Sequence, residues 1–374
     1  MLKILYITDY LRQRFGVTNV ILNYIEHFPM QQIKVDVLCY EGSEEAPIKR
    51  LESCGCKVFF MPVLGMRSIR QFKCHIESFF KNNNYDVVHS HFNQIDGIVF
   101  PIARKNGSCV CISHSHNTKL AQTRLKEIRN RIMCFNISEN ADYWAACSDD
   151  AGVALFGKSY PDSQKRILIK NGIECSNFVF SSSERTKIRL DLGVHDDELL
   201  LGTVGSFKPQ KNHIFLLELF CELFRRNENY KLLLVGDGEL RPLYEKFIDS
   251  KGLTDRVIMT GVRNDVNLIL NALDVFILPS IFEGLGVSAI EAQANGLKCI
   301  VSSAVPKEAM VTDNIVFLSL EKSVLVWCKC IEHLSSYKRV DLANEVARQG
   351  YDINSAASIL ENTYVKIVNQ SLNR

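Results

Sequence analysis

The sequence has no long apolar run. Its first apolar stretch, Ile4 to Ile7, ends at Thr8 and is shorter than the hydrophobic region of a secretion signal. Elsewhere no segment approaches the roughly 18 consecutive apolar residues that suggest a membrane-spanning helix. These absences predict a cytoplasmic chain that does not cross a membrane.

Three sequence patterns are also missing. No G-x-G-x-x-G follows the first strand, which argues against a dinucleotide-binding dehydrogenase. No D-x-D motif is present that could hold a divalent metal against a diphosphate. No internal repeat of about 20 to 50 residues appears, so a solenoid or propeller is not expected.

The 13 cysteines do not form a recognisable metal motif. Zinc sites usually combine two C-x2-4-C pairs, whereas here the close pairs are C-x-C. Without a secretion signal, a reducing compartment is expected, in which cysteines act as small buried apolar residues. We expect no disulfide and no metal. The pairs are Cys54 with Cys56, Cys109 with Cys111, and Cys328 with Cys330.

The length and the distribution of charge suggest two unlike halves. A chain of 374 residues with 47% hydrophobic and 23% charged residues favours two soluble domains. The net charge is +2, yet residues 1–175 hold 22 Lys and Arg against 17 Asp and Glu, which is +5, and the remainder is −3. The only polar low-complexity stretch, Ser181 to Arg185, places the linker at about 175–185.

The basic excess concentrates in residues 119–131, where apolar residues recur at helical spacing. One interpretation is a solvated helix face. The other is contact with an anionic membrane surface or a lipid diphosphate acceptor. Nucleic acid is not expected, because no aromatic residues interleave with the charge. The basic residues in question are Lys119, Lys126, Arg129 and Arg131.

Strand and helix patterns alternate along the whole chain. Such alternation predicts parallel sheets with helices on both faces, whose ligands bind beyond the carboxyl ends of the strands. The expected strands of the first half are 2–8, 33–39, 57–61, 86–90, 109–113, 143–147 and 166–170, and those of the second half are 199–204, 230–235, 256–260, 274–278, 298–301 and 314–318.

Residues 274–296 combine a buried strand, a glycine turn and the start of a helix. Pro279 ends the strand, and Gly284 and Gly286 lie at the turn. A helix N-terminus behind such a turn offers free amides to a phosphate or diphosphate. Glu283 and Glu291 flank these amides and would accept hydrogen bonds from sugar hydroxyls. The alternative is an ordinary strand-helix unit with two solvated glutamates.

The segment from Glu283 to Glu291 resembles the E-x7-E signature of the retaining family 4 (group 1) glycosyltransferases, in the versions found in bacterial capsule, exopolysaccharide and O-antigen synthesis. The resemblance implies the GT-B fold, in which two Rossmann-like, doubly wound parallel-sheet domains face each other across a cleft. It implies residues 1–175 plus 355–374 as the acceptor-side domain with a returning C-terminal helix. Residues 176–354 would bind the nucleotide sugar.

The resemblance also assigns a donor site. Lys211 matches the lysine of the family's phosphate segment and would neutralise the departing nucleotide. Ser206 stands where the family usually has Arg, and Lys208 is the nearest substitute for its charge. A single glycine, Gly16, replaces the usual adjacent pair at the first turn. The donor set is Gly16, Ser206, Lys208, Lys211, Gly238, Val262, Glu283, Gly284, Leu285, Gly286, Val287 and Glu291.

Histidines follow two expected strands, in the sequences His89-Ser90-His91 and His114-Ser115-His116. A histidine at a strand end is often a hydrogen-bonded structural residue. The second sequence resembles the family's strand-end histidine, which lies near donor sugar and acceptor, and His116 matches it better than His114. The resemblance implies Glu283, Lys211 and His116 as catalytic, with His91 and His114 on the acceptor side.

The implied activity is transfer of a hexosyl or N-acetylhexosaminyl group, with retention, from a nucleotide sugar to a glycan or lipid-linked glycan. UDP-sugars are common donors in such families, and no metal cofactor is expected. The chain would work in the cytoplasm, with peripheral association to the inner face of the cell membrane. Two alternatives remain open, namely a nucleotide-sugar epimerase of the same fold and a catalytically silent partner subunit.

Overall fold

The computed structural model describes residues 1–374 except 14, 66–67, 108–109, 122–123, 335–336 and 373–374. Cys109, the first residue of the strand expected at 109–113, therefore lies outside the described residues. The chain divides into two compact units. Unit 1 comprises residues 1–173 and 350–374, and unit 2 comprises residues 174–349.

Unit 1 is built on a parallel sheet that has seven strands within the described residues, in the order β3-β2-β1-β4-β5-β6-β7. Its strands are β1 Leu2–Ile7, β2 Ile33–Tyr40, β3 Val58–Met61, β4 Val87–Ser90, β5 Val110–Ser115, β6 Tyr143–Ala146 and β7 Arg166–Leu168. Its helices are α1 Gly16–His27, α2 Glu45–Ser53, α3 Ile69–Asn82, η1 Asn93–Ile95, α4 Asp96–Lys105, α5 Arg124–Met133, α6 Ile137–Asn140, α7 Asp149–Phe156 and α15 Ile353–Leu372.

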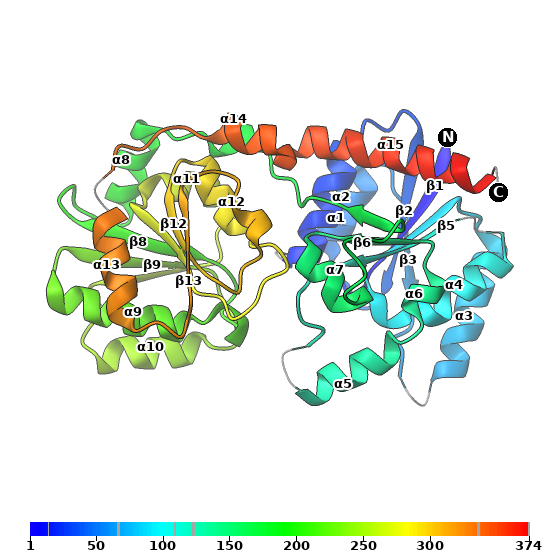
Figure 1. Cartoon of the computed structure of the whole chain (residues 1–374), viewed down its shortest axis with the longest axis horizontal. Coiled ribbons are helices and arrows are strands. Elements are labelled where there is room, and N and C mark those ends of the chain that lie inside the picture. The colour runs from blue at the N-terminus through cyan, green and yellow to red at the C-terminus, as the bar shows by residue number, and fades with distance from the viewer. Residues whose placement is uncertain (14, 66–67, 108–109, 122–123, 335–336, 373–374) are drawn as a thin grey trace. The chain divides into compact units, whose positions relative to one another are not determined.

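Helices cover both faces of this sheet (Figure 1). One layer contains α1, α2 and α15, and α3, α4 and α6 pack together in another. The C-terminal helix α15 lies against α1, where Leu360 and Ile367 join Ile21 and Ile25 in one buried cluster. Burial of such side chains stabilises the unit by roughly 1.5–3 kcal/mol each. The last helix is therefore part of the core of unit 1.

The segment that leaves unit 1 and the segment that returns to it run side by side. Ile173 and Asp352 form a parallel bridge, with Ile173 donating its amide to the Tyr351 carbonyl at 2.8 Å. A side chain on Gly172 would come within 2.9 Å of the Ile353 backbone, so only glycine permits this close crossing. The two crossing segments are thus fixed to each other by backbone contacts.

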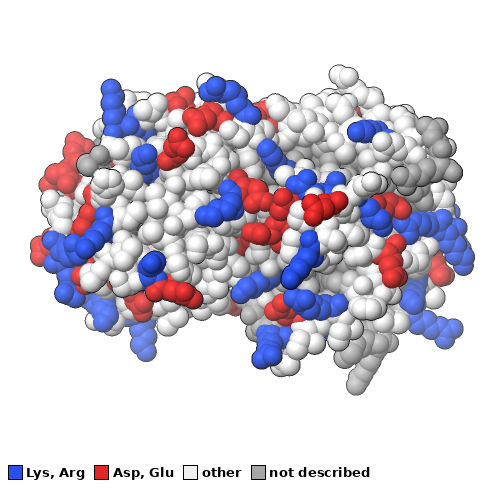
Figure 2. Space-filling view, in the orientation of Figure 1, with Lys and Arg blue, Asp and Glu red and all other residues white. Residues whose placement is uncertain are grey.

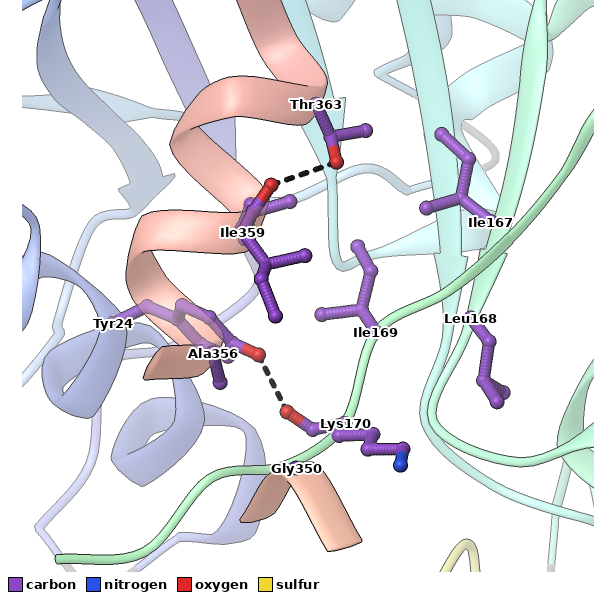
Figure 3. Close-up of a pocket in the computed structure, with 10 residues that line it drawn as sticks. Tyr24, Ile167, Leu168, Ile169, Lys170, Gly350, Ala356, Ile359 and Thr363 are labelled. Carbon is purple, nitrogen blue, oxygen red and sulfur yellow. Dashed lines mark hydrogen bonds between the residues drawn. The ribbon is translucent and has the colours of Figure 1, made fainter. Parts of the chain in front are cut away.

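A small pocket lies beside this crossing (Figure 3). Its volume is about 160 Å³, and its apolar lining includes Ile169 and Ile359. The Tyr24 hydroxyl donates a hydrogen bond to the Lys170 carbonyl at its edge. None of the candidate site residues lines this pocket, which belongs to the packing of α15 on β7.

Unit 2 repeats the same topology. In its described part, six parallel strands follow the order β10-β9-β8-β11-β12-β13. The strands are β8 Leu199–Val204, β9 Tyr230–Val235, β10 Val257–Gly261, β11 Val275–Leu278, β12 Lys298–Ser302 and β13 Ile315–Leu318. The helices are η2 Cys175–Phe178, α8 Ser182–Asp191, η3 Pro209–Lys211, α9 His213–Arg226, α10 Arg241–Ser250, α11 Val266–Ala272, α12 Val287–Ala294, η4 Lys307–Ala309, α13 Val324–Leu334 and α14 Ala343–Val346, with one π-helical turn, η5 Ala347–Tyr351, leading back to unit 1.

Two helix layers sandwich this second sheet as well. Helix α9 packs against α10 and α13, and α8 packs against α11. The strands β8, β9 and β11 carry fully buried apolar side chains that face one layer or the other. A strand buried on both faces reads as a continuous apolar run, which is why these segments were recognisable in the sequence.

The Ser181 to Arg185 stretch, on which the expected linker at about 175–185 rested, is the start of a helix. Ser181 caps α8, because its hydroxyl accepts a hydrogen bond from the Glu184 amide at 3.3 Å. Arg185 lies in the same helix and donates to the Asp274 carboxylate at 2.6 Å. The Ser-rich composition belongs to a helix N-terminal capping sequence, S-x-x-E. Composition alone does not distinguish such a sequence from a loop.

Among the described residues, no helix is long and apolar enough to cross a bilayer. Basic and acidic side chains are interspersed over the face of the molecule shown in Figure 2. Because the net charge is only +2, any electrostatic recognition must come from local groups of charges rather than from the charge of the whole molecule.

Candidate functional site

Unit 2 has its topological switch point between β8 and β11. These two strands pair in the centre of the sheet, Leu201 opposite Val275, while β9 and β10 extend to one side and β12 and β13 to the other. The connections after β8 and β11 therefore leave in opposite directions. A crevice at the carboxyl ends of such strands is where doubly wound sheets bind ligands.

Lys211 and Glu283 meet at this switch point. Lys211 ends η3 after β8, Glu283 follows β11, and the lysine Nζ lies 2.7 Å from Glu283 Oε1. The Ser280 hydroxyl donates to the same oxygen at 2.6 Å. Glu283 is only 6% exposed, so its charge is balanced inside the protein rather than by bulk water. Sequence reasoning had placed both residues in the site, but it had not foreseen this ion pair.

The backbone holds the two loops together. Ile281 donates its amide to the Gln210 carbonyl at 2.8 Å, and the Asn212 side chain donates to the Pro279 carbonyl at 3.2 Å. Asn212 adopts a left-handed conformation (φ +54°), which asparagine tolerates better than most residues. Ser280 and Gln210 support the ion pair and were missed in the sequence, because neither carries a motif signal.

Helix α12 begins directly behind Glu283 with a set of free amides. Gly286 precedes it in the left-handed region (φ +86°), which favours glycine. Among the described residues, no hydrogen-bond acceptor contacts the backbone N–H groups of residues 285–288. Together with the helix dipole, these amides form an anion-binding end. Gly284, Leu285, Gly286 and Val287 are thus placed where the motif predicted a turn and a helix start.

Glu291 lies further along α12 and is partly exposed. Within the described part of the chain, no hydrogen-bond donor reaches its carboxylate. Burial raises the pKa of this carboxyl to about 7, and the positive charge of Lys211 acts against that rise. A carboxylate with open acceptor positions can bind a hydroxyl pair of a sugar.

The other donor candidates of unit 2 lie on adjoining loops at the same end of the sheet. Phe207 donates its amide to the Asp237 carbonyl at 2.9 Å, and Gly236 donates to Gly261 at 2.9 Å, so the loops after β8, β9 and β10 are joined. A Cβ on Gly238 would lie 2.6 Å from the Phe207 carbonyl oxygen, so the contact requires glycine. The candidates on these loops are Ser206 and Val262, both exposed, and Lys208 and Gly238, both partly exposed.

Gly16 is the exception, because it belongs to unit 1 and is the first residue of α1. It is exposed, and a Cβ there would meet nothing within 4 Å. The structure of unit 1 alone therefore gives no packing reason for glycine at this position.

Unit 1 carries the histidine group at the adjacent ends of β4 and β5. The rings of His114 and His116 stack with centroids 4.0 Å apart, and those of His89 and His91 stack at 4.5 Å. Across the strands, His91 Nδ1 lies 2.8 Å from His116 Nε2, and His89 Nε2 lies 3.2 Å from His114 Nδ1. Both expected histidine sequences thus come together in one cluster.

Burial keeps these imidazoles uncharged. It lowers the pKa of His116 to about 4 and that of His89 to about 3, and the neighbouring imidazoles add to the lowering at His89. The same two causes hold the pKa of His91 and His114 well below the usual range. The cluster therefore offers neutral nitrogens rather than positive charge at neutral pH.

Two tyrosines complete this cluster and were not anticipated from the sequence. The Tyr364 hydroxyl lies 2.6 Å from His89 Nδ1 and 2.8 Å from the Tyr6 hydroxyl. Tyr6 was within reach of prediction, since β1 and β4 are neighbours and Tyr6 pairs with His89. Tyr364 comes from α15, 275 residues after His89, and nothing local marks it.

Comparison with known proteins identifies the chain. Residues 16–177 match the family model Glycosyltransferase Family 4, and residues 184–323 match Glycosyl transferases group 1. A protein of Bacillus subtilis (strain 168) named as glycosyltransferase EpsF is 30% identical over 358 residues, which cover 94% of this chain and 93% of that protein. The chain belongs to the family 4, group 1 glycosyltransferases.

Two further similarities agree. A UDP-Gal:alpha-D-GlcNAc-diphosphoundecaprenol alpha-1,3-galactosyltransferase of Escherichia coli is 28% identical over 77% of this glycosyltransferase and 76% of its own length. The crystal structure of Anabaena HepE in complex with UDP-glucose shares the fold, with a TM-score of 0.72, 17% identity and coverage of 100% of this chain and 99% of that one. The predicted GT-B class, with two Rossmann-like parallel-sheet domains, is confirmed.

Proposed function

We propose that this glycosyltransferase transfers a hexosyl or N-acetylhexosaminyl group from a UDP-sugar to a glycan or lipid-linked glycan, with retention of configuration, in bacterial surface polysaccharide synthesis. The E. coli relative, named for a UDP-galactose donor and a lipid-diphosphate-linked acceptor, supports the donor and the acceptor class. The resemblance of the Glu283 segment to capsule, exopolysaccharide and O-antigen transferases supports the pathway class.

The observation that carries the proposal is the pairing of Lys211 with Glu283 beside the free amides of α12. A nucleotide sugar presents a diphosphate next to a hydroxyl-rich ring. The amides of residues 285–288 and the Lys211 ammonium suit the diphosphate, while the Glu283 carboxylate suits the sugar hydroxyls. Glu291, with its open acceptor positions, would bind the ribose of the nucleotide.

Lys211 can also bind the donor without leaving Glu283. The lysine ammonium has three donor positions, so it can bind a phosphate oxygen while remaining near Glu283. As the bond from the sugar to the diphosphate breaks, negative charge grows on the leaving phosphate. A preorganised cation at that point stabilises the transition state more than the ground state.

In the proposed reaction, the acceptor hydroxyl attacks the anomeric carbon on the face from which the nucleotide departs. The bond from C1 to the phosphate oxygen breaks, the bond from C1 to the acceptor oxygen forms, and the acceptor proton passes to the leaving phosphate. No protein nucleophile and no metal is needed in this scheme. His116, with His91 and His114 beside it, would belong to the acceptor side of unit 1.

We further propose that α5 attaches unit 1 to the inner face of the cell membrane. Leu125, Ile128 and Ile132 form an apolar stripe on this helix and are 82%, 50% and 71% exposed. Asn130 faces the protein instead, where its side chain donates to the Leu120 carbonyl at 2.7 Å. Exposed apolar residues flanked by bases are typical of helices that lie in a membrane interface. The exposed bases of this segment are Lys119, Arg124, Lys126, Arg129 and Arg131.

Vesicle sedimentation tests the role of α5. Replacing Lys126 and Arg129 with Glu should reduce binding to phosphatidylglycerol vesicles by roughly tenfold or more, at about 1 kcal/mol for each basic residue near the surface. Transfer to a soluble acceptor analogue should be unchanged. A matched double reversal of Lys246 and Lys251, which are exposed in unit 2, serves as the control. Equal binding by the two reversed proteins would make α5 an ordinary solvated helix.

A donor panel tests the activity. The purified protein is incubated with individual UDP-, GDP- and dTDP-sugars and a polyprenyl-diphosphate-linked sugar, and products are analysed by mass spectrometry and NMR. The proposal predicts an acceptor extended from one UDP-sugar with the anomeric configuration of the donor. Epimerised donor in the absence of acceptor would identify an epimerase, and no turnover with any donor would favour a silent subunit.

A further inference from the structure

The histidine cluster of unit 1 brings three possible metal ligands together. One ring nitrogen from each of His89, His91 and His114 can be chosen so that all three lie within 4.8 Å of one another. All three side chains are buried, and they come from the ends of two adjacent strands. Their positions are therefore set by the sheet, which is a rigid support for a binding site.

Two nitrogens of this cluster have no hydrogen-bond partner in the described part of the molecule. They are His91 Nε2 and His114 Nε2, both buried. Leaving such a polar atom buried and unsatisfied costs roughly 1–3 kcal/mol. A bound ion would satisfy His91 Nε2, since the lone pair of a neutral imidazole is a metal ligand.

The separation of two nitrogens already fits one ion. His89 Nε2 and His114 Nδ1 are 3.2 Å apart. Two nitrogens bound to one tetrahedral zinc ion at about 2.1 Å each lie about 3.4 Å from each other. One of the two nitrogens now carries the proton of their hydrogen bond. On metal binding this proton would move to the other nitrogen of the same ring, because a metal-bound imidazole stays neutral.

The surroundings also match those of histidine ligands. Metal-binding histidines usually hold their second ring nitrogen in a hydrogen bond, which fixes the ring. His89 Nδ1 is held by the Tyr364 hydroxyl at 2.6 Å, and His91 Nδ1 is held by His116 Nε2 at 2.8 Å. These hydrogen bonds occupy the Nδ1 atoms of His89 and His91, so an ion would bind each ring through its Nε2 atom.

We propose that His89, His91 and His114 form a binding site for a zinc-class divalent transition-metal ion, with its fourth position open to water. Imidazole ligands suit zinc, copper and nickel, whereas magnesium and calcium prefer oxygen ligands. The expectation of no metal rested on missing D-x-D and cysteine patterns, and neither pattern covers nitrogens contributed by two strands. The site rests on unit 1 alone and does not depend on the proposed transfer reaction.

A bound ion would change the electrostatic environment of His116. The His116 ring stacks on His114 at 4.0 Å and bonds His91, so an ion would put positive charge next to a buried neutral imidazole. We expect the ion to lower glycosyl transfer reversibly. Metal binding and this inhibition can be measured separately, so failure of one does not obscure the other.

Titration with Zn²⁺ and Co²⁺ tests the site directly. Metal-stripped, reduced protein should bind about one Zn²⁺ per chain in calorimetry. Co²⁺ should give visible bands of a tetrahedral nitrogen site. The near-ultraviolet band of thiolate ligation should be absent, which separates this site from binding to any of the 13 cysteines. No binding, or a thiolate spectrum, would overturn the proposal.

Variants locate the ion. His114→Gln and His91→Gln should each abolish the Co²⁺ bands, whereas the same change at exposed His333 should leave them intact. Tyr364→Phe keeps all three ligands but releases His89, so it should weaken binding by about 10- to 100-fold. Circular dichroism and thermal melting check that each variant folds. Unchanged binding in folded His114→Gln and His91→Gln would contradict the assignment.

Discussion

The two units share the order of their first strands, yet the side chains near the centre of each sheet differ in chemistry. In each unit the first strand lies between the second and fourth, so the chain order turns at the centre of the sheet. At that point unit 2 holds an ion pair, a carboxylate with open acceptor positions and free helix amides. Next to the corresponding point, at the ends of β4 and β5, unit 1 holds four uncharged imidazoles with two tyrosines beside them.

The difference shows what the topology does and does not determine. It fixes which loop ends come together, because the connections on either side of the switch point diverge. It does not fix what they bind, since function depends on the side chains placed there. A charged site suits a diphosphate, whereas a neutral aromatic site suits an uncharged acceptor or, as proposed, a metal ion.

The largest effect is expected for Lys211→Ala. Removing the cation beside the leaving diphosphate should reduce transfer by about 2–4 kcal/mol, roughly 30- to 1,000-fold in kcat/KM. Steady-state kinetics with the preferred donor measure this loss. Lys246→Ala, at an exposed position of α10, is the matched control and should be unaffected. Unchanged kcat/KM for Lys211→Ala would remove this residue from the site.

His116→Ala tests whether the work is divided between the units. If His116 serves the acceptor side, transfer should fall by about 100-fold through loss of positioning. The affinity for free nucleotide diphosphate should be unchanged, because all proposed nucleotide contacts other than Gly16 belong to unit 2. Calorimetry and kinetics on one protein preparation separate the two effects. A parallel loss of nucleotide affinity would break the comparison between the units.

A smaller effect, dependent on pH, is expected at Glu291. Its carboxyl has a pKa of about 7, so the acceptor form is lost as the pH falls through that value. Nucleotide affinity in the wild type should therefore rise between pH 6 and pH 8. Glu291→Gln should bind more weakly, by about 1.5–3 kcal/mol at high pH, and should lack this rise apart from titration of the nucleotide itself.

The same carboxyl gives a second measurement by linkage. Its folded pKa of about 7 is raised above the usual value near 4.3, so the folded state binds the proton more tightly. The wild type should lose unfolding free energy relative to Glu291→Gln as the pH rises between these two values. Partial exposure of Glu291 keeps this effect small. Identical pH profiles for the two proteins in both assays would show that Glu291 does not titrate there.

Much of the fold could be predicted because buried parallel strands are continuous apolar runs. The segments 199–204 and 230–235 were predicted to the residue, and other strands differ by one or two positions at their ends. The Ser181 segment was misread because a capping sequence and a loop share the same composition. Local pattern alone could not separate the two.

The site was only partly predictable. Lys211, Glu283 and the α12 amides could be expected together, since each follows a strand at one edge of the sheet. Their direct ion pair and the support from Ser280 depend on side-chain packing that no motif encodes. Likewise, the histidine sequences could be placed at two strand ends, but Tyr364 reaches them only because α15 returns to unit 1.

The central claim is that Glu283, just before α12, and Glu291, within α12, bind two different parts of one donor. Comparison of Glu283→Ala with Glu291→Ala tests this claim most directly. Transfer and calorimetric affinity for free nucleotide diphosphate are measured for both variants. Glu283→Ala should lose transfer strongly and still bind the nucleotide diphosphate nearly as well as the wild type, since Lys211 is then released from its ion pair. Glu291→Ala should lose both. Full transfer by Glu283→Ala with the preferred sugar would contradict the account.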